Sequence, residues 1–579
     1  VQYKEFKWKY IQTKHFDVYF NQGGQYVGEF AAVVAESSLS SLTRNLDYHI
    51  SNRIPLVIFN SHNEFQQNNI LDEYLPEGVG GVTELFKNRA LIPFEGDYEK
   101  FRHVIHHELL HAFMNDMFYG GSIQNIISKN ITLNFPIWFN EGMAEVQSLY
   151  GLDKKTDMFM RDAVINNYVP PLDYINGYFA YRGGQSFFAF LADVYGEEKI
   201  GELMNNIKTF GDVDMGFQET YKLNIGELSD KWLKYLKKMY WPDIDTREET
   251  DDFSKRITDH RKDGGFYNVS PVLSPKGDKF AFISNRDDNF DIFIADANTG
   301  RIIEKVVKGE TSVNFEELHI LTPGLTWSPD GRKIAVSVKA GSKDAIFIID
   351  IESGDKDELP IHLDGIFYVT WSPVNKDVIA FVGNNSKQSD IYIYNLKTNQ
   401  MTALTNDVFS DLTPTWSHDG QEIYFNSDRG SYVNPSSIPA NFKMSNYDFD
   451  RSDLYKVNIN TKEIIRQSDS KDYSESYVMF SPDGKRKLFI SDKNGISNLY
   501  IQEADTSGNQ IERPITNSLN PIDQISLSRD GKKLLFVALN EGGYDIFSID
   551  NPLEKTLSVA ELPLTDYMIK RKEWRAKFG

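Results

Sequence analysis

The stretch WSPDGRKIAVSV, residues 327–338, decides how the second half of the chain folds. It joins a tight turn of Pro, Asp and Gly to a strand in which apolar residues alternate with others. A second strand, such as FDIFIADANTG at 290–300, follows the turn after about ten residues. The pattern occurs six times, as LSPKGDKFAFIS (273–284), WSPDGRKIAVSV (327–338), WSPVNKDVIAFV (371–382), WSHDGQEIYFNS (416–427), FSPDGKRKLFIS (480–491) and LSRDGKKLLFVA (527–538). Each unit is therefore predicted to be a β-meander.

A meander of this size cannot bury both faces of its sheet alone, so the units must pack against one another. Repeats spaced by about 45 to 60 residues usually pack radially as propeller blades, and six copies predict six blades. These repeats are similar to the TolB-type propeller repeats with an SPDG turn, over about residues 260–566. The resemblance implies an exported protein of the bacterial periplasm or outer envelope, whose propeller could bind partners in an envelope protein complex.

A few positions of the repeats need separate interpretation. Blade four carries an insertion at 428–452, whose aromatic, Asn, Ser and Pro content fits either a functional loop or a flexible one. Asp330, Asp419 and Asp483 are interpreted as turn formers. The histidines of the repeats are isolated from one another in the sequence, so we expect no second metal site there. They are His260, His319, His362 and His418.

Composition limits the kinds of function that the chain can have. Its 579 residues suggest about three to four domain-sized units, and 40% hydrophobic with 25% charged residues are ordinary globular proportions. The net charge of -21, without clustered Lys and Arg, argues against a nucleic-acid partner. Cysteine is absent, which excludes disulfides and thiolate ligands, so any zinc site must use His, Asp or Glu.

The start of the chain and its apolar runs bear on where it resides. The sequence begins with Val1 and shows no charged-then-apolar leader, which fits either a mature form or an excised piece. The nearest candidate for a long apolar run, SFFAFLADV at 186–194, is far shorter than the roughly 18 residues that cross a bilayer. We therefore expect no membrane-spanning segment in the given chain.

The first half of the chain differs in kind from the repeats. Strand patterns occur at 6–20, 54–59 and 80–94, a helical pattern occurs at 26–46, and helical spacing dominates from Glu99 to about Tyr240. The predicted fold class is multidomain, with an α+β domain followed by an all-β six-bladed propeller. The expected divisions are the α+β domain at 1–245, a charged linker at 246–265, the propeller at 266–566 and a basic tail at 567–579.

The segment HVIHHELLHAF at 103–113 contains the candidate chemistry. On a helix, His107 and His111 lie one turn apart on one face, so both rings can reach one metal ion. Glu108 sits about 100° round the helix and can reach a water molecule beside that ion without becoming a ligand. Because H-E-x-x-H would arise by chance in such a chain at roughly the per cent level, the prediction needs a third ligand.

The run NFPIWFNEGMAEVQSLY, further along the chain, supplies that ligand. It fits a helix with Glu141 and Glu145 one turn apart. An H-E-x-x-H helix followed by WFNEGMAE resembles the gluzincin zinc peptidases, whose second helix carries W-[LF]-N-E-G-x-A and a further acid. The resemblance implies Zn²⁺ held by His107, His111 and Glu141, with Glu145 orienting a zinc-bound histidine; the reverse roles of the two glutamates are the alternative. The gap before Glu141 is longer than in the aminopeptidase members, which leaves subfamily and substrate size open.

Weaker patterns surround the predicted centre. The string YRGGQSFFAFL is similar to the gluzincin segment whose tyrosine stabilises the oxyanion, which implies Tyr181. Tyr178 is the alternative, and simple packing of both tyrosines is a third possibility. Residues 80–94 form a predicted strand pair that either holds an extended peptide or is a plain sheet edge. His103 and His106 are expected to pack or hydrogen bond rather than to bind the metal.

The sequence therefore predicts a zinc-dependent peptidase acting on a peptide or protein substrate, with Glu108 as the general base that passes a proton to the leaving amine. The propeller would gate access or bind protein partners. A serine hydrolase of the prolyl oligopeptidase type can also follow TolB-like blades, but no G-x-S-x-G elbow exists and only about thirty residues follow the sixth repeat. The remaining alternative is a non-catalytic envelope component whose peptidase-like domain is structural or regulatory.

Overall fold

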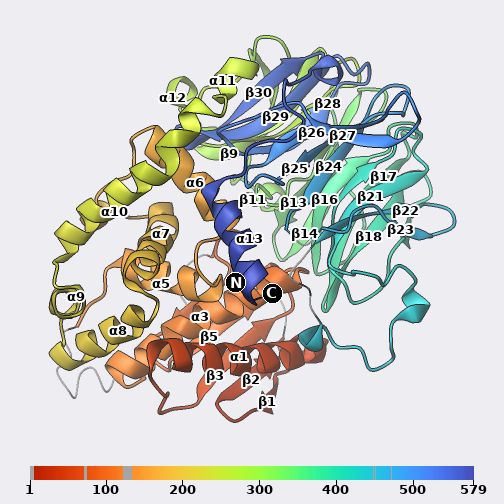
Figure 1. Ribbon diagram of the computed structural model, residues 1–579. Helices are drawn as coiled ribbons and strands as arrows, with labels where there is room; N and C mark the ends of the chain where they lie inside the picture. Colours follow the sequence, from red (N-terminus) through yellow and green to blue (C-terminus); the bar gives the residue numbers. More distant parts are fainter. Residues whose placement is uncertain are drawn as a thin grey trace. The chain divides into compact units, whose positions relative to one another are not determined.

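The computed structural model describes residues 5–70, 75–121, 133–447, 449, 452–470 and 472–578. They form two compact units, divided in the sequence between Pro242 and Asp243. The first unit contains a mixed sheet with helices, and the second is a propeller of six blades (Figure 1). The predicted fold class, an α+β domain followed by an all-β six-bladed propeller, is confirmed.

A five-stranded sheet organises the N-terminal unit, in the order β1-β2-β3-β5-β4. Its strands are β1 (Lys9–Gln12), β2 (Phe16–Phe20), β3 (Ile54–Phe59), β4 (Val82–Glu84) and β5 (Arg89–Pro93). β2, β3 and β5 run parallel, whereas β1 and β4 pair antiparallel at the two edges. β3 reads IPLVIF and is buried almost throughout, as expected of a central parallel strand. β4 is an edge strand of this sheet.

The helices of the N-terminal unit include the two that carry the predicted ligands. They are α1 (Gln25–Leu46), α2 (His62–Phe65), α3 (Tyr98–Tyr119), α5 (Ile137–Ser148), α6 (Lys154–Ile165), α7 (Tyr178–Tyr195), α8 (Glu198–Phe210), α9 (Val213–Tyr221) and α10 (Ile225–Tyr240). α3 begins where the side chain of Asp97 accepts a hydrogen bond from the backbone N–H of Lys100. It ends at Gly120, whose φ of 68° is a conformation that glycine adopts most readily. α3 packs against α1, α5 and β4.

Helices α5 and α7 approach each other more closely than most side chains would allow. A Cβ atom on Gly142 would lie 2.3 Å from the backbone of Gly184, and one on Gly184 would lie 2.3 Å from the carbonyl oxygen of Trp138. Both positions therefore require glycine because the two backbones touch. This crossing fixes how far the side chains of α5 lie from those at the start of α7.

Six antiparallel sheets form the propeller, and each sheet is one blade. Blade one contains β7 (Asn268–Leu273), β8 (Lys279–Asp287), β9 (Asn289–Asp296) and β10 (Ile302–Val307), and blade two contains β11 (Glu317–Leu318), β12 (Leu325–Trp327), β13 (Lys333–Ala340), β14 (Lys343–Asp350) and β15 (Lys356–Glu358). Blade three contains β16 (Gly365–Trp371), β17 (Val378–Asn385), β18 (Gln388–Asn395) and β19 (Gln400–Ala403), and blade four contains β20 (Asp411–Trp416), β21 (Glu422–Ser427), β22 (Asp453–Asn458) and β23 (Ile464–Arg466). Blade five contains β24 (Glu475–Phe480), β25 (Lys487–Ser491), β26 (Asn498–Ala504) and β27 (Gln510–Pro514), and blade six contains β28 (Ile522–Leu527), β29 (Lys533–Asn540), β30 (Gly543–Asp550) and β6 (Lys255–Arg256). Short helices α11 (Thr250–Phe253) and α12 (His260–Asp263) flank β6, and α13 (Asp566–Phe578) follows blade six. The six predicted turns join β7 to β8 and the equivalent strands of the other blades.

Each blade is linked to the next by a buried Asp or Asn. This residue lies near the start of β9, β14, β18, β22, β26 and β30 in blades one to six. Each of these residues is at most 3% exposed. Each accepts a hydrogen bond of 2.8 to 3.2 Å from a backbone N–H that leads into the following blade: Asp291 from Gly309, Asp344 from Ile366, Asp390 from Asp407, Asp453 from Ser470, Asn498 from Ser518 and Asp545 from His260. We call these contacts the blade clasps. They pair buried polar groups that would otherwise destabilise the ring.

The charged stretch 246–265, predicted to be a linker, is instead part of the propeller. Its strand β6 pairs with β30 as the outermost strand of blade six. The ring closes because Arg256, Thr258 and His260 all donate hydrogen bonds to the carboxylate of Asp545. The prediction was wrong because a two-residue strand has no periodicity, and the partner of Arg256 lies 289 residues further along the chain.

Two other regions of the propeller unit have more structure than the repeats alone indicate. The predicted basic tail forms α13, where Arg575 forms an ion pair with Asp472. The described part of the blade-four insertion, 428–452, is packed by rings whose centroids lie 5.2 to 5.9 Å apart. These rings belong to Phe409, Tyr432, Phe442 and Tyr447.

Asp390 differs from the other clasp carboxylates in its charge environment. Among the described residues, no Lys or Arg pairs with it, whereas its counterparts Asp291, Asp453 and Asp545 pair with Lys305, Arg466 and Arg256. The nearby Arg429 forms ion pairs with Asp407 and Asp411 instead, at 2.9 and 2.6 Å. Burial, and then the negative charge of Asp411, raise the pKa of Asp390 to about 8.

Replacing Asp390 by Asn is predicted to make the propeller less sensitive to pH. The folded chain holds a proton on Asp390 up to a pH of about 8, whereas an unfolded Asp releases it near pH 3.9. The folded state therefore binds more protons, and stability falls as the pH rises toward 8. Between pH 6 and pH 9 the wild type should lose on the order of 2 kcal/mol more than Asp390→Asn, measured by denaturant unfolding.

Asp453→Asn is the matched control for this comparison. It removes the equivalent carboxylate from a clasp that pairs with Arg466, so it should destabilise the propeller at both pH values. An identical pH dependence in the wild type and in Asp390→Asn would contradict the assignment.

Candidate metal centre

Helices α3 and α5 bring the three predicted metal ligands together. On α3 the Nε2 atoms of His107 and His111 lie 3.2 Å apart. On α5 the Oε2 atom of Glu141 lies 3.1 Å from Nε2 of His107 and 3.5 Å from Nε2 of His111. The three side chains are 10 to 19% exposed, so the group is largely shielded from solvent. The three atoms form a small, nearly equilateral triangle.

The size and chemistry of this triangle suit one zinc ion. Zinc binds His nitrogen and carboxylate oxygen at about 2.0 to 2.2 Å, which places tetrahedral ligands about 3.3 Å apart. The three observed separations lie around that value. Two imidazoles and one carboxylate are also the donor set of a catalytic zinc site that keeps its fourth position open. The residues present therefore fit the ion that the sequence predicts.

Glu145, one turn after Glu141, holds the other side of His107. Its Oε1 atom lies 2.9 Å from Nδ1 of His107, so the imidazole donates this proton to Glu145 and turns Nε2 toward the triangle. The other oxygen of Glu145 accepts a hydrogen bond of 3.3 Å from Arg182 on α7. Geometry thus favours the predicted roles of Glu141 and Glu145 over the reverse.

The charge balance of the group keeps its carboxylates ionised. Burial would raise the pKa of Glu141, but hydrogen bonds with His107 and His111 outweigh burial and lower that pKa to about 2. Burial likewise disfavours the charged form of His107, yet hydrogen bonds with Glu141 and Glu145 raise its pKa to about 10. Paired imidazoles and carboxylates of this kind exchange their protons for a cation when a metal binds.

Glu108, the predicted general base, is held by the edge strand β4. The hydroxyl of Thr83 lies 2.7 Å from Oε2 of Glu108 and 3.0 Å from its backbone carbonyl, so its one proton is shared between these two acceptors. A Cβ atom on Gly81 would lie 2.8 Å from Cγ of Glu108, so glycine at this position lets the strand approach the helix. The predicted strand pair 80–94 is therefore in contact with the candidate site, whether or not it holds a peptide.

Of the two tyrosines considered from the sequence, Tyr181 lies closer to the candidate centre. Its ring is nearly parallel to that of His107, with centroids 6.1 Å apart. Burial, and then the charges of Glu141 and Glu108, raise the pKa of Tyr181 above its usual value, so the phenol stays protonated. The hydroxyl of Tyr178 instead accepts a hydrogen bond of 2.8 Å from Arg182.

The two flanking histidines occupy supporting positions. Nε2 of His103 lies 3.4 Å from Oε1 of Glu145, so His103 shares that carboxylate with His107. His106 is buried with its ring 5.8 Å from that of Tyr150, and burial lowers its pKa to about 3. His106 faces away from the triangle, as expected, whereas His103 forms with His107 and Glu145 a second group of possible metal ligands.

Two further groups of acidic residues lie in the described part of the propeller. They are Asp259 with His260 and Asp545, and Asp390 with Asp407 and Asp411. Arg256 binds the first group and Arg429 the second, so each already has a cation among its contacts. The first group is the ring closure described above. Neither combines two imidazoles with a carboxylate, which is one of the donor sets of catalytic zinc sites.

Thr83 and Arg182 were not predicted as site residues. Arg182 directly follows Tyr181, and a charged residue near the start of a largely apolar helix was the signal that could have found it. Thr83 gives no such signal, because its contact with Glu108 spans 25 residues and two different elements. Sequence periodicity places residues on a face of an element but does not identify which element faces it.

Comparisons with known proteins give one family match in each of the two units of the chain. Residues 34–238 match the family model described as Peptidase MA superfamily, and residues 308–436 match the model described as TolB beta propeller domain. The chain therefore carries a Peptidase MA superfamily domain followed by a TolB-type six-bladed propeller. No helix among the described residues is both long and apolar enough to cross a membrane.

Curated relatives match only part of the chain. The Tol-Pal system protein TolB of Francisella tularensis subsp. mediasiatica is 23% identical over 295 residues, which are 48% of this chain and 61% of that protein. TolB of the holarctica strain OSU18 is 24% identical over 297 residues, with the same coverage. The chain thus spans about three fifths of the length of these relatives.

Two solved structures are similar to about half of the chain. The crystal structure of TolB from Acinetobacter baumannii has a TM-score of 0.35 and 18% identity, and covers 49% of this chain and 66% of its own. The crystal structure of the tricorn protease has a TM-score of 0.32 and 17% identity, and covers 50% of this chain and 30% of its own.

Replacing Glu145 by Gln is predicted to weaken zinc binding without removing a ligand. The amide no longer carries the charge that fixes the tautomer and orientation of His107, and loss of such a partner typically lowers metal affinity by about 10 to 100-fold. Competition with a chromophoric zinc chelator measures the change. Glu95→Gln is the control, because Glu95 is another buried carboxylate that pairs with His62 and Lys100. Equal zinc affinities for both variants would contradict the role assigned to Glu145.

Proposed function

We propose that the N-terminal unit is a zinc-dependent peptidase. The observation that carries the proposal is the triangle of His107, His111 and Glu141, whose separations match tetrahedral zinc ligation. Tyr181 lies beside the triangle, with its ring centroid 6.1 Å from that of His107, and the charges of Glu141 and Glu108 add to burial in raising its pKa. The match of residues 34–238 to the Peptidase MA superfamily supports the same reaction class.

The general base of the proposed reaction is Glu108. When bound by His107, His111 and Glu141, zinc would polarise a substrate carbonyl and make water more acidic. Glu108 takes the proton from the attacking water and passes it to the leaving amine as the peptide bond breaks. The hydrogen bond from Thr83 holds Oε2 of Glu108, and Oε1 is proposed to receive that proton.

Tyr181 is proposed to stabilise the oxyanion that forms on the attacked carbonyl. Its phenol stays protonated because burial and the surrounding carboxylates raise its pKa, so it can donate a hydrogen bond. Strand β4 is proposed to hold the substrate, because edge strands bind extended peptides through backbone hydrogen bonds. Since Thr83 of β4 contacts Glu108, a peptide paired with this strand would pass directly beside the base.

We further propose that the protein acts in the bacterial cell envelope, where the propeller binds protein partners or controls access to the peptidase. Support comes from the similarity of the propeller to proteins named as Tol-Pal system TolB. A non-catalytic role in an envelope complex is the alternative. It predicts that zinc binds but that no peptide is cleaved.

The variant Glu108→Gln should lose peptidase activity and keep its zinc. Removal of a general base lowers the rate by about 10² to 10⁴-fold, while the three ligands are untouched. Cleavage of a mixed peptide library followed by mass spectrometry measures activity, and elemental analysis measures zinc. Glu36→Gln is the control, because Glu36 pairs with His15 away from the site. Turnover at the wild-type rate by Glu108→Gln would rule out this base.

Kinetic measurements can distinguish whether Tyr181 or Tyr178 stabilises the oxyanion. Tyr181→Phe should lower kcat by about 10² to 10³-fold with little change in KM, since a transition-state hydrogen bond is removed. Tyr178→Phe loses only a contact with Arg182 and should retain most of its activity. If Tyr178→Phe has the larger effect on kcat, the oxyanion role belongs to Tyr178 and the assignment of Tyr181 is wrong.

A further inference from the structure

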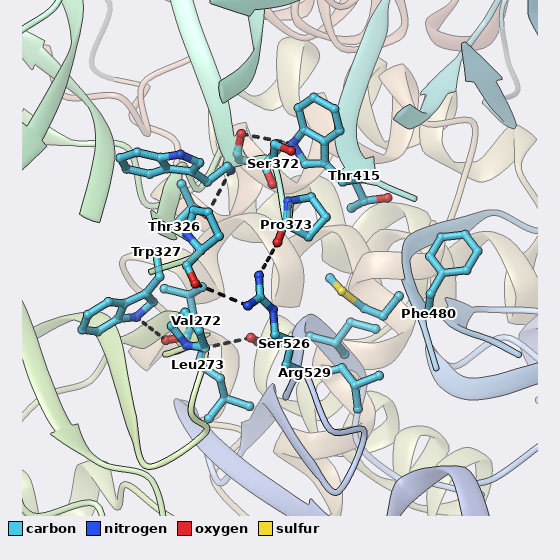
Figure 2. A pocket seen from close by; sticks show the side chains of 18 of the residues that line it. Val272, Leu273, Thr326, Trp327, Ser372, Pro373, Thr415, Phe480, Ser526 and Arg529 are labelled. Carbon is cyan, nitrogen blue, oxygen red and sulfur yellow. Dashed lines mark hydrogen bonds between the residues drawn. The ribbon is translucent and has the colours of Figure 1, made fainter. Parts of the chain in front are cut away.

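A cavity of about 950 Å³ lies at the centre of the propeller, and its function is not explained by the peptidase site. Its lining comes from the first strands of all six blades and from the turns that follow them (Figure 2). Binding pockets for ligands typically have volumes of about 300 to 1,000 Å³. The cavity is therefore large enough for several amino-acid residues and much larger than a small inorganic anion.

One position of the repeat, the residue after the turn serine, differs between blades in a way that the fold does not require. The residue after the turn serine is Pro in four of the six repeats, namely Pro275, Pro329, Pro373 and Pro482. It is His418 in blade four and Arg529 in blade six. All six of these residues line the cavity. Because Pro forms this turn in most blades, the turn itself does not require the arginine.

The guanidinium of Arg529 reaches across the cavity from blade six. It donates hydrogen bonds to the backbone carbonyls of Pro329, at 3.4 Å, and Pro373 (Figure 2). Among the described residues no carboxylate forms an ion pair with it. Guanidinium bonds to a carboxylate are stronger than bonds to neutral carbonyls and can form in pairs. A carboxylate entering the cavity could therefore replace the two carbonyls.

The carboxylates of the repeat turns do not neutralise this cation. Asp330 is the one acidic residue among the described residues that line the cavity. It is held in its own turn, where it accepts hydrogen bonds from the hydroxyl of Ser328 and the backbone N–H of Arg332. Lys376 also lines the cavity. In a chain with a net charge of -21, this cavity has a local excess of positive charge and suits an anion.

The remaining lining favours a peptide over a sugar. Polar lining groups are already used within the fold: the hydroxyl of Thr326 accepts from the backbone N–H of Trp371, and that of Ser526 from Leu273. A sugar would need several free donors and acceptors, whereas apolar side chains such as Phe480 and the turn prolines can pack against peptide side chains.

We propose that this cavity binds an extended peptide segment through a carboxylate, which pairs with Arg529 in place of the Pro329 and Pro373 carbonyls. The peptide's neutral residues contact the apolar lining, and its carboxylate is either a chain terminus or an acidic side chain. The proposal concerns binding by the propeller and does not depend on hydrolysis by the N-terminal unit.

Equilibrium dialysis of the full chain against defined peptide mixtures tests the proposal. The chain carries Glu108→Gln so that the peptides are not cleaved. Hexapeptides with five positions drawn from Gly, Ala, Ser, Leu and Phe end in a free-acid Ala, an amidated Asp or, as the neutral reference, an amidated Asn. Mass spectrometry measures the retained fraction of each mixture. The first two mixtures distinguish a terminal carboxylate from a side-chain carboxylate.

At least one carboxylate mixture should be retained about tenfold more than the neutral mixture, because the neutral peptides cannot form the charge-assisted hydrogen bonds with Arg529. Arg529→Pro, which introduces the residue that other repeats use, should abolish this difference, and Arg529→Gln should do the same without changing the backbone. Arg332→Ala, an exposed arginine after the turn of blade two, should leave it unchanged. Equal retention of charged and neutral mixtures, or retention unaffected by either Arg529 variant, would overturn the proposal.

Discussion

The imidazole of His107, held between two carboxylates, is the contact on which the candidate centre depends. Glu145 accepts the Nδ1 proton, and this orients Nε2 toward His111 and Glu141. Glu145 is in turn held by Arg182 from α7. The two helices reach each other only because Gly142 and Gly184 have no side chains at their crossing. The orientation of His107 thus depends on the packing of α5 against α7 as well as on the ligands themselves.

The propeller shows the same relation between a regular framework and specialised positions. Six buried Asp or Asn residues repeat one hydrogen bond from blade to blade, and the last of them, Asp545, closes the ring onto β6. Positions that depart from the repeat carry the distinct chemistry. In the part of the chain that the structure describes, Asp390 pairs with no Lys or Arg, unlike several of its counterparts, and Arg529 replaces a turn proline. In a repeat protein the other copies serve as an internal reference for what the fold itself requires.

Sequence reasoning predicted what periodicity and local spacing encode. The six turns, the H-E-x-x-H helix and the later WFNEGMAE helix all have regular spacing, and the structure forms these elements as expected. It failed where contacts join segments that are distant in the sequence. The two residues of β6 pair with β30, which follows them only after all the intervening blades. Thr83 and Arg182 were missed for the same reason. Pairing between elements depends on packing, which no single sequence window contains.

The central claim is that two imidazoles and one carboxylate hold one zinc ion. Zinc K-edge X-ray absorption of the full chain, loaded with one equivalent of zinc, tests it most directly. The account predicts four nitrogen or oxygen neighbours at about 2.0 Å, with scattering from two imidazole rings. A spectrum with three imidazoles would place His103 in the ligand set, and one without imidazole scattering would place the ion elsewhere. Either result would contradict the assignment of His107, His111 and Glu141.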